Sequence, residues 1–244
     1  MKFKSLLTLI AAGGICLAPA AAFAQGTDKQ PTKEVKKETK KEMKEVRKEA
    51  MASMDGAKVG EKAPAFTLTD SDGKTVNLAD LTKEKKIVVL EWFNPTCPFV
   101  QKHHQANKTM SETAKAFKDK NVVWLAVNSG ATSAEDNNAA KKTYGINYPI
   151  LMDKGGAVAK TYGSKNTPTM FIINADGVLA YRGAIDDNPD AATLGKKNYV
   201  KQALEQILKG ETVTEPQTKA YGCHVAYAEG KDTDKAPAKK DEKK

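Results

Sequence analysis

Cys97 is the residue best placed for chemistry, because it follows an apolar run over residues 87–93 and directly precedes Pro98. Proline fits the first position of a helix, where no backbone donor is lost, so we expect a buried strand, a short turn and a helix that begins at Pro98. The positive end of the helix dipole would then face the Cys97 sulfur and favour its thiolate. This setting predicts a reactive cysteine rather than an ordinary buried one.

Glu91 is the one carboxylate inside the apolar run over residues 87–93. A carboxylate buried in a central strand should have a raised pKa, and it could pass a proton through water during thiol chemistry. The alternative is an edge position that faces solvent. We therefore predict that Glu91 assists Cys97.

Cys223 lies in a segment, residues 211–228, that follows the last predicted helix and has flexible points at Pro216 and Gly222. A cysteine on such a strap could reach Cys97 and attack its sulfenic acid or mixed disulfide. Two alternatives are an inert disulfide that closes a long loop and pairing with another molecule. The pattern favours a redox pair of Cys97 and Cys223.

The histidines do not complete a cysteine hydrolase. In a regular helix His103 and His104 would lie ~9–10 Å along the axis from Cys97, so we expect them at the surface or rim. Cys97, Cys223, His224 and His104 could serve as copper or zinc ligands. Since they lack the short spacing of a convincing metal site, the sequence predicts no metal and no cofactor.

Residues 1–24 predict export. Lysines precede an apolar run over residues 6–22, and Ala22 and Ala24 are the small residues that a signal peptidase reads. We expect cleavage after Ala24 and a periplasmic or secreted protein without stable membrane insertion. An uncleaved anchor and a lipid anchor on Cys16 are the alternatives. Disulfides persist outside the cytoplasm, so the two remaining cysteines are meaningful there.

The formal net charge of +9 is spread along the chain, and arginine occurs only at Arg47 and Arg182. This composition lacks the clustered arginines and aromatic residues of a nucleic-acid platform, so we predict no nucleic-acid partner. Lys/Glu-rich residues 25–57 predict a charged arm, and residues 229–244 predict a disordered tail.

Residues 58–210 are long enough for one domain with a proper core. Their alternation of apolar runs and amphipathic stretches predicts an α/β domain, with a central sheet flanked by helices. The expected strands are 65–68, 75–78, 87–93, 122–127, 169–173 and 178–182, with a further short apolar segment over 148–152, and the expected helices are 98–118, 132–144, 157–162 and 199–208.

Several segments, in order, resemble the redoxin group of the thioredoxin-like superfamily. They are residues 60–66 (GEKAPAF), residues 88–93 (VVLEWF) leading to Cys97, and residues 166–173 (NTPTMFII) followed by Asp176-Gly177. This group includes exported thiol–disulfide oxidoreductases and the alkyl hydroperoxide reductase/thiol-specific antioxidant (AhpC/TSA) proteins. The resemblance covers about residues 58–210 and implies a thioredoxin-like fold with a central mixed sheet.

By this resemblance Cys97 takes the place of the nucleophilic cysteine and Glu91 that of the buried acid. Pro168 takes the place of the cis-proline beside the active site, where Thr167 would offer backbone groups to a bound peptide or mixed disulfide. The predicted substrate-binding residues are Thr96, Pro98, Thr167 and Pro168.

The chain also departs from its relatives' patterns. Val100 stands where thioredoxins carry the second cysteine of Cys-x-x-Cys, so no local partner can resolve Cys97. Peroxiredoxins carry a threonine three residues before their cysteine and a nearby arginine. Here Thr96 directly precedes Cys97, and the domain arginine, Arg182, lies on the predicted hairpin.

We therefore predict an exported thiol–disulfide oxidoreductase in which Cys97 is the nucleophile and Cys223 resolves it. Its expected partners are protein or small-molecule thiols and disulfides, with an external thiol as electron donor. One alternative is a thiol peroxidase that acts on peroxides. Another is a non-enzymatic binding protein for copper or haem assembly on the same fold.

Overall fold

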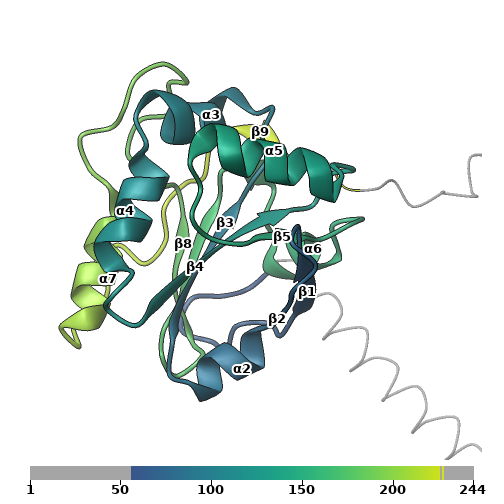
Figure 1. Ribbon diagram of the computed structural model, residues 1–244. Helices are drawn as coiled ribbons and strands as arrows, with labels where there is room; N and C mark the ends of the chain where they lie inside the picture. Colours follow the sequence, from purple (N-terminus) through teal and green to yellow (C-terminus); the bar gives the residue numbers. More distant parts are fainter. Residues whose placement is uncertain (1–55, 226, 228–244) are drawn as a thin grey trace, which may run out of the picture. The chain divides into compact units, whose positions relative to one another are not determined.

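The computed structural model describes residues 56–225 and residue 227 (Figure 1). The predicted signal peptide, the charged arm up to residue 55 and the tail from residue 229 lie outside these residues. Within them, no helix combines the length and the apolar character that crossing a bilayer requires.

A mixed sheet of seven strands forms the centre of the described domain (Figure 1). Its strands are β1 (Thr67–Asp70), β2 (Thr75–Asn77), β3 (Ile87–Trp92), β4 (Val122–Asn128), β5 (Ile150–Met152), β7 (Met170–Ile173) and β8 (Leu179–Gly183). They lie in the order β2-β1-β5-β4-β3-β7-β8, with β3, β4 and β5 parallel and the remaining pairs antiparallel. The prediction of an α/β, thioredoxin-like fold with a central mixed sheet is confirmed.

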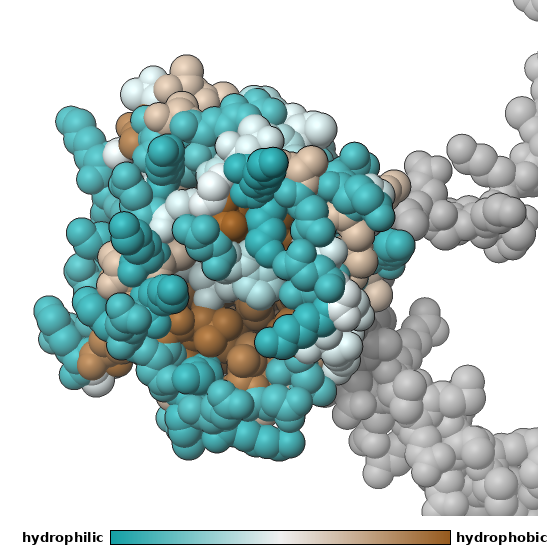
Figure 2. All heavy atoms as spheres, viewed as in Figure 1, coloured by the Kyte–Doolittle hydropathy of each residue, from teal (hydrophilic) through white to brown (hydrophobic). Residues whose placement is uncertain are grey.

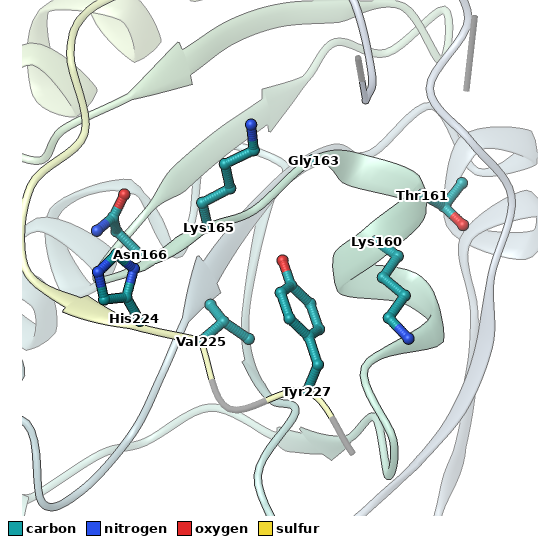
Figure 3. A pocket seen from close by; sticks show the side chains of 8 residues that line it. All are labelled: Lys160, Thr161, Gly163, Lys165, Asn166, His224, Val225 and Tyr227. Atoms are coloured by element: carbon teal, nitrogen blue, oxygen red, sulfur yellow. The ribbon is translucent and has the colours of Figure 1, made fainter. Parts of the chain in front are cut away.

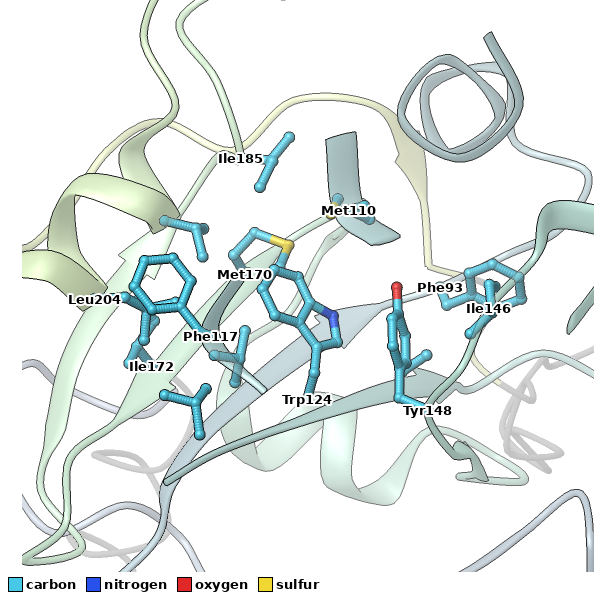
Figure 4. Packing of buried hydrophobic residues seen from close by; sticks show 14 of the residues in the cluster. Phe93, Met110, Phe117, Trp124, Ile146, Tyr148, Met170, Ile172, Ile185 and Leu204 are labelled. Atoms are coloured by element: carbon cyan, nitrogen blue, oxygen red, sulfur yellow. The ribbon is translucent and has the colours of Figure 1, made fainter. Parts of the chain in front are cut away.

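Helices cover both faces of this sheet. They are α2 (Leu78–Lys83), α3 (Pro98–Gln101), the π-helix η1 (Lys102–Ala106), α4 (Thr109–Phe117), α5 (Ala134–Tyr144), α6 (Ala157–Tyr162) and α7 (Tyr199–Leu208). One apolar core joins α3, α4, α5 and α7 to the first face (Figure 4), and a second core joins α2 and α6 to the other. Hydrophilic side chains cover most of the face seen in Figure 2, with apolar atoms visible in a hollow below its centre.

Strand β3 is buried along its whole length because it lies between β4 and β7. Side chains alternate along a strand, so Val89 and Phe93 enter the first core while Leu90 and Trp92 enter the second. Glu91 shares the parity of Val89 and Phe93. Its carboxylate is therefore placed in the layer that also holds α3, η1 and α4.

The predicted helix over residues 98–118 is wrong in one respect, because it is divided into α3, η1 and α4. The wider turn of a π-helix inserts an extra residue, and the Asn107 amide donates to the Lys102 carbonyl at 3.0 Å. Lys108 then adopts a left-handed conformation with φ +52° before α4 begins. The helix is thus interrupted at Lys108, six residues before Ala114 of α4. Residues 102–106 do not occupy the positions of a regular α-helix.

Asn77 marks another difference from the sequence prediction. Its side chain accepts a hydrogen bond from the Ala79 backbone at 2.7 Å and begins α2, a helix that the sequence analysis did not predict. The strand expected over residues 75–78 therefore ends at Asn77.

The segment after α7 returns across the sheet edge toward Cys97. Gln217 bridges to Arg182 of β8, and residues 223–224 then form strand β9 (Cys223–His224). This strand pairs with β6 (Asn166–Thr167) in a separate two-stranded antiparallel ladder. The segment that the sequence predicts to be flexible is thus held by backbone pairing.

Candidate active site

Cys97 is the N-cap residue of α3, and Pro98 takes the first helical position, as predicted. The Cys97 carbonyl accepts from the Gln101 backbone at 2.9 Å, and its own N–H donates to the Asn94 carbonyl at 3.1 Å. These bonds fix the turn between β3 and α3. Only 2% of Cys97 is exposed, so its sulfur lies beneath neighbouring chain rather than on an open surface.

Cys223 is the residue that covers it. Across the β6–β9 ladder Cys223 faces Thr167, and its Sγ lies 2.7 Å from Sγ of Cys97. Both cysteines are free thiols, and the Cys97 thiol also donates to the Thr167 carbonyl at 3.1 Å. Two residues 126 positions apart in sequence are therefore within reach of disulfide formation.

The two thiols differ in acidity. Burial raises the pKa of Cys97, but hydrogen bonds, above all the one from the Cys223 thiol, outweigh burial and place this pKa below the ordinary value of 9.0. The backbone N–H of Val100 in α3 contributes in the same direction. Burial and the interaction with Cys97 raise the pKa of Cys223 to about 11. Cys97 is thus the more acidic thiol of the pair and the one that ionises first as the pH rises.

The four predicted substrate-binding residues surround Cys97. The Thr167–Pro168 peptide bond is cis, as the resemblance implies, and both residues are buried beside β9. Thr96 and Pro98 are exposed at the rim. The Thr96 hydroxyl donates to the Asn94 side chain at 2.9 Å, which orders the turn before the cysteine.

Glu91 is fully buried, so the alternative of a solvent-facing edge position is wrong. One carboxylate oxygen accepts from His104 Nε2 at 2.5 Å, and the other accepts from Trp124 and Tyr148 at 3.0 Å each. Burial raises the pKa of Glu91, but the ion pair with His104 and these hydrogen bonds outweigh it. The pKa lies below the ordinary 4.5, which corrects the expectation of a raised value.

His103 and His104 are both completely buried, so their predicted place at the surface or rim is wrong. The cause is η1, whose wider turn directs these consecutive residues to two different interior partners. His104 contacts Glu91, and His103 Nε2 lies 3.0 Å from the Tyr221 hydroxyl.

The metal-ligand set considered from the sequence is not brought together. His104 is turned onto Glu91 and His224 is exposed. Among the residues that the structure describes, no group of three or more His, Cys, Asp and Glu side chains is placed to hold a metal ion.

Several residues near the site were missed by sequence reasoning. Trp124 and Tyr148 bind Glu91, and their signal was their place in apolar segments next to the central strand. Tyr221 stands two residues before Cys223 in the segment already singled out. Lys102 and Asp186, which lie beneath Tyr221, gave no local signal because their partners are distant in sequence.

Arg182 does not supply the arginine of a peroxidase site in this arrangement. Its guanidinium donates to the Ala57 carbonyl at 2.8 Å and lies 5.9 Å from the centre of the Phe171 ring. Phe171 belongs to the second core, on the sheet face opposite the one that holds Cys97.

A pocket of about 700 Å³ lies beside β9 and is lined in part by Lys160, Lys165, Asn166 and His224. Figure 3 shows the Tyr227 ring in the middle of this pocket, with Lys160 on one side and His224 on the other. Its lining is therefore an aromatic ring among basic and amide side chains, next to the strand that carries Cys223.

Known proteins resemble the described domain in sequence and in fold. The redoxin family model matches residues 58–202. A protein named thiol-disulfide oxidoreductase ResA from Bacillus thuringiensis subsp. konkukian is 33% identical over 152 residues, which are 62% of this chain and 78% of the relative. The protein of the same name from Bacillus subtilis is 32% identical over 126 residues, 52% of this chain and 67% of the relative.

Two solved structures share the fold across most of their length. An uncharacterized conserved protein from Geobacillus kaustophilus aligns with a TM-score of 0.65 and 29% identity, covering 71% of this chain and 94% of its own. A hypothetical protein from Sinorhizobium meliloti 1021 aligns with a TM-score of 0.64 and 26% identity, covering 72% and 97%.

Proposed function

The chain belongs to the redoxin family, and from this premise we propose that it is a thiol–disulfide oxidoreductase in which Cys97 is the nucleophile and Cys223 the resolving cysteine. The observation that carries the proposal is the 2.7 Å separation of the two sulfurs. Their unequal acidity, with the lower pKa at Cys97, supports the assignment of the roles. The relatives named thiol-disulfide oxidoreductase support the reaction class.

The reaction begins with attack by the Cys97 thiolate on one sulfur of a partner's disulfide. A bond forms between Cys97 and that sulfur, the partner's S–S bond breaks, and its second sulfur leaves as a thiolate. Because Cys97 is almost fully covered, β9 must shift to admit the partner. The product of this step is a mixed disulfide at Cys97.

Cys223 then loses its proton and attacks the Cys97 sulfur. The Cys97–Cys223 bond forms, the mixed disulfide breaks, and the partner's remaining sulfur leaves as a thiol after protonation. The partner has gained two electrons and the dithiol has lost them. An external thiol donor returns the Cys97–Cys223 disulfide to the dithiol by two further exchange steps.

Glu91 is proposed to exchange a proton with Cys97 through water. Because its pKa lies below the ordinary value, Glu91 is ionised near neutral pH and would accept a proton rather than donate one. His104 is bound to the same carboxylate at 2.5 Å, so it would hold the carboxylate in position and share its charge.

The proposed partner surface consists of the exposed rim and the groups beneath β9. Thr96 and Pro98 would contact the partner first, and Thr167 and Pro168 would receive its extended chain once β9 moves. Protein or small-molecule disulfides fit this role. We further propose that the protein works outside the cytoplasm, on the evidence of residues 1–24.

The test is a redox titration of the mature protein in glutathione buffers, with alkylation and mass spectrometry of Cys97 and Cys223 at each potential. We expect a reversible Cys97–Cys223 bond with a potential between roughly −120 and −270 mV, the range of catalytic dithiols. Absence of the bond, or a potential well below about −300 mV, would overturn the proposal. The matched control is Cys223→Ser, which should stop at a mixed disulfide with glutathione.

A further inference from the structure

A buried charged cluster lies beneath the segment that carries Cys223, and the reaction above does not use it. The Lys102 and His103 side chains are completely buried, and 4% of the Asp186 side chain is exposed. Lys102 Nζ lies 3.4 Å from Asp186 Oδ2 and donates to the Asn188 carbonyl at 2.7 Å. Charges removed from water in this way persist only where they are paired and hydrogen-bonded.

Tyr221 joins this cluster through its hydroxyl group. The hydroxyl donates to the Asp186 carboxylate, which is an acceptor, so the hydroxyl oxygen accepts from His103 Nε2 at 3.0 Å. Burial and the bond to Asp186 raise the pKa of Tyr221, so the hydroxyl keeps the proton that this bond needs. The Lys102 ammonium lies 5.2 Å from the centre of the ring. Tyr221 is therefore bound through the face of its ring, by a cation–π contact, as well as through its hydroxyl group.

The position of Tyr221 determines where Cys223 lies. Gly222 is the single residue between them, with φ +117°, and a Cβ there would clash with the Thr167 carbonyl. The Gly222 carbonyl accepts from the Asn166 amide at 3.0 Å. The backbone around Gly222 is therefore held in place, although glycine is the residue about which this segment could most easily turn.

The other end of the segment is held separately. Val225 is buried, and its backbone N–H donates to the Lys165 carbonyl at 3.0 Å. Cys223 thus sits between an apolar anchor at Val225 and a polar anchor at Tyr221. Only the polar anchor involves buried charge.

We propose that Tyr221, His103 and Asp186 are positioning residues that latch Cys223 over Cys97. The latch sets the effective concentration of the Cys223 thiol at Cys97 and limits the access of other molecules to the nucleophile. Its effect on resolution rests on the proposed function, whereas its effect on access to Cys97 does not.

The test compares Tyr221→Phe with Tyr162→Phe. Both variants remove one tyrosine hydroxyl, but that of Tyr162 donates to the Pro64 carbonyl at 2.7 Å in the second core. In the fully reduced protein we measure the rate at which iodoacetamide alkylates Cys97. In glutathione buffers we measure the equilibrium constant for the Cys97–Cys223 disulfide.

We expect Tyr221→Phe to alkylate Cys97 roughly tenfold faster and to form the disulfide with a roughly tenfold lower equilibrium constant, as loss of a charge-assisted hydrogen bond would produce. For a two-electron couple this equals a potential about 30 mV less negative. Tyr162→Phe should match the wild type in both measurements. Wild-type values for Tyr221→Phe would overturn the latch.

Two further variants separate positioning from general stability. His103→Gln retains an N–H that can reach Tyr221 and should keep the alkylation rate near the wild-type value, while His103→Leu should raise it. Equal rates in both variants would contradict the latch. If the wild-type protein forms no reversible disulfide, the proposed function fails, and the alkylation rates of the reduced variants still decide whether the latch exists.

Discussion

Cys223 faces Thr167 across the β6–β9 ladder, next to the cis peptide bond of Pro168. The backbone that was expected to receive an extended peptide thus pairs with the chain's own C-terminal segment. This register also brings the Cys223 sulfur to Cys97. In the reduced protein the proposed resolving cysteine therefore occupies the place proposed for a partner's chain, and on that proposal exchange requires β9 to leave β6 and return.

Gly222 provides the sharpest test of this register. Its φ of +117° and the clash that a Cβ would make with the Thr167 carbonyl mean that Gly222→Ala must push β9 away from β6. We expect the rate of Cys97–Cys223 disulfide formation to fall roughly tenfold or more, in line with the 1–3 kcal/mol range of overpacking. The measurement is stopped-flow oxidation of the reduced protein followed by acid quenching and mass spectrometry.

The matched control for that variant is Gly210→Ala. Gly210 also has a positive φ, +75°, but a Cβ there would meet no atom within 4 Å. Backbone strain alone should lower stability slightly and leave disulfide formation unchanged. If both variants slow oxidation equally, the close approach of Gly222 to Thr167 is not what places Cys223.

The acidity of Cys97 depends on the neighbouring thiol, which a pair of Cys223 variants can separate from burial. The hydrogen bond between the two thiols helps to lower the pKa of Cys97. Cys223→Ser keeps a donor and should leave the Cys97 pKa depressed, whereas Cys223→Ala removes the donor and should raise it. The thiolate absorbance in the ultraviolet, followed against pH, reports the difference, and Cys97→Ser in each background identifies the signal.

Identical titrations of the serine and alanine variants would show that the helix N-terminus, not Cys223, sets the acidity of Cys97. In either variant we expect turnover with a disulfide substrate to be lost, because no resolving cysteine remains. Cys97→Ser should abolish even the first exchange step.

The local parts of the site follow from neighbouring residues, and these the sequence predicts well. The apolar run that ends before Cys97 becomes β3, and Pro98 begins α3 because proline suits the first helical position. The amphipathic helix over residues 199–208 has the expected bounds as well. Each of these features is decided by side-chain types within about one turn or one strand.

The remaining parts depend on contacts between distant residues. A regular helix placed His103 and His104 on its surface, but the π-turn of η1 buries both, and no local pattern announces that turn. The lowered pKa of Glu91 depends on partners up to 57 residues away. Likewise, Tyr221 binds Asp186, 35 residues earlier, so the sequence shows a flexible segment where the fold makes an anchored one.

Glu91→Gln tests the buried ion pair. Removing one partner leaves the His104 imidazole without its carboxylate, and we expect a loss of about 3–5 kcal/mol of unfolding free energy near neutral pH. The folded-state pKa of Glu91 lies below 4.5, so the wild-type carboxylate stabilises the fold above that pH, and this stabilisation is lost as the pH falls further. The difference between variant and wild type should therefore shrink below pH 4.5.

Urea unfolding followed by tryptophan fluorescence, at neutral and at acidic pH, measures this difference. The control is Glu205→Gln on the exposed side of α7, which should match the wild type at both pH values. If Glu91→Gln is as stable as the wild type at neutral pH, the attraction between Glu91 and His104 only offsets the free energy that is needed to remove the two groups from water.

His103 should make the protein less stable in mild acid. Burial lowers the pKa of His103 from 6.5 to about 4, although the nearby Asp186 carboxylate acts in the opposite direction. The neutral imidazole therefore stabilises the fold fully above pH 6.5, and this contribution falls as the pH drops toward 4 because the unfolded chain binds the proton first. At 1.36 kcal/mol for each pH unit, the loss of unfolding free energy over this window is about 3 kcal/mol.

His103→Gln cannot titrate, so its unfolding free energy should stay constant between these two pH values. The exposed His224→Gln is the control and should keep the wild-type slope. A slope that persists in His103→Gln would assign the acid sensitivity to another group.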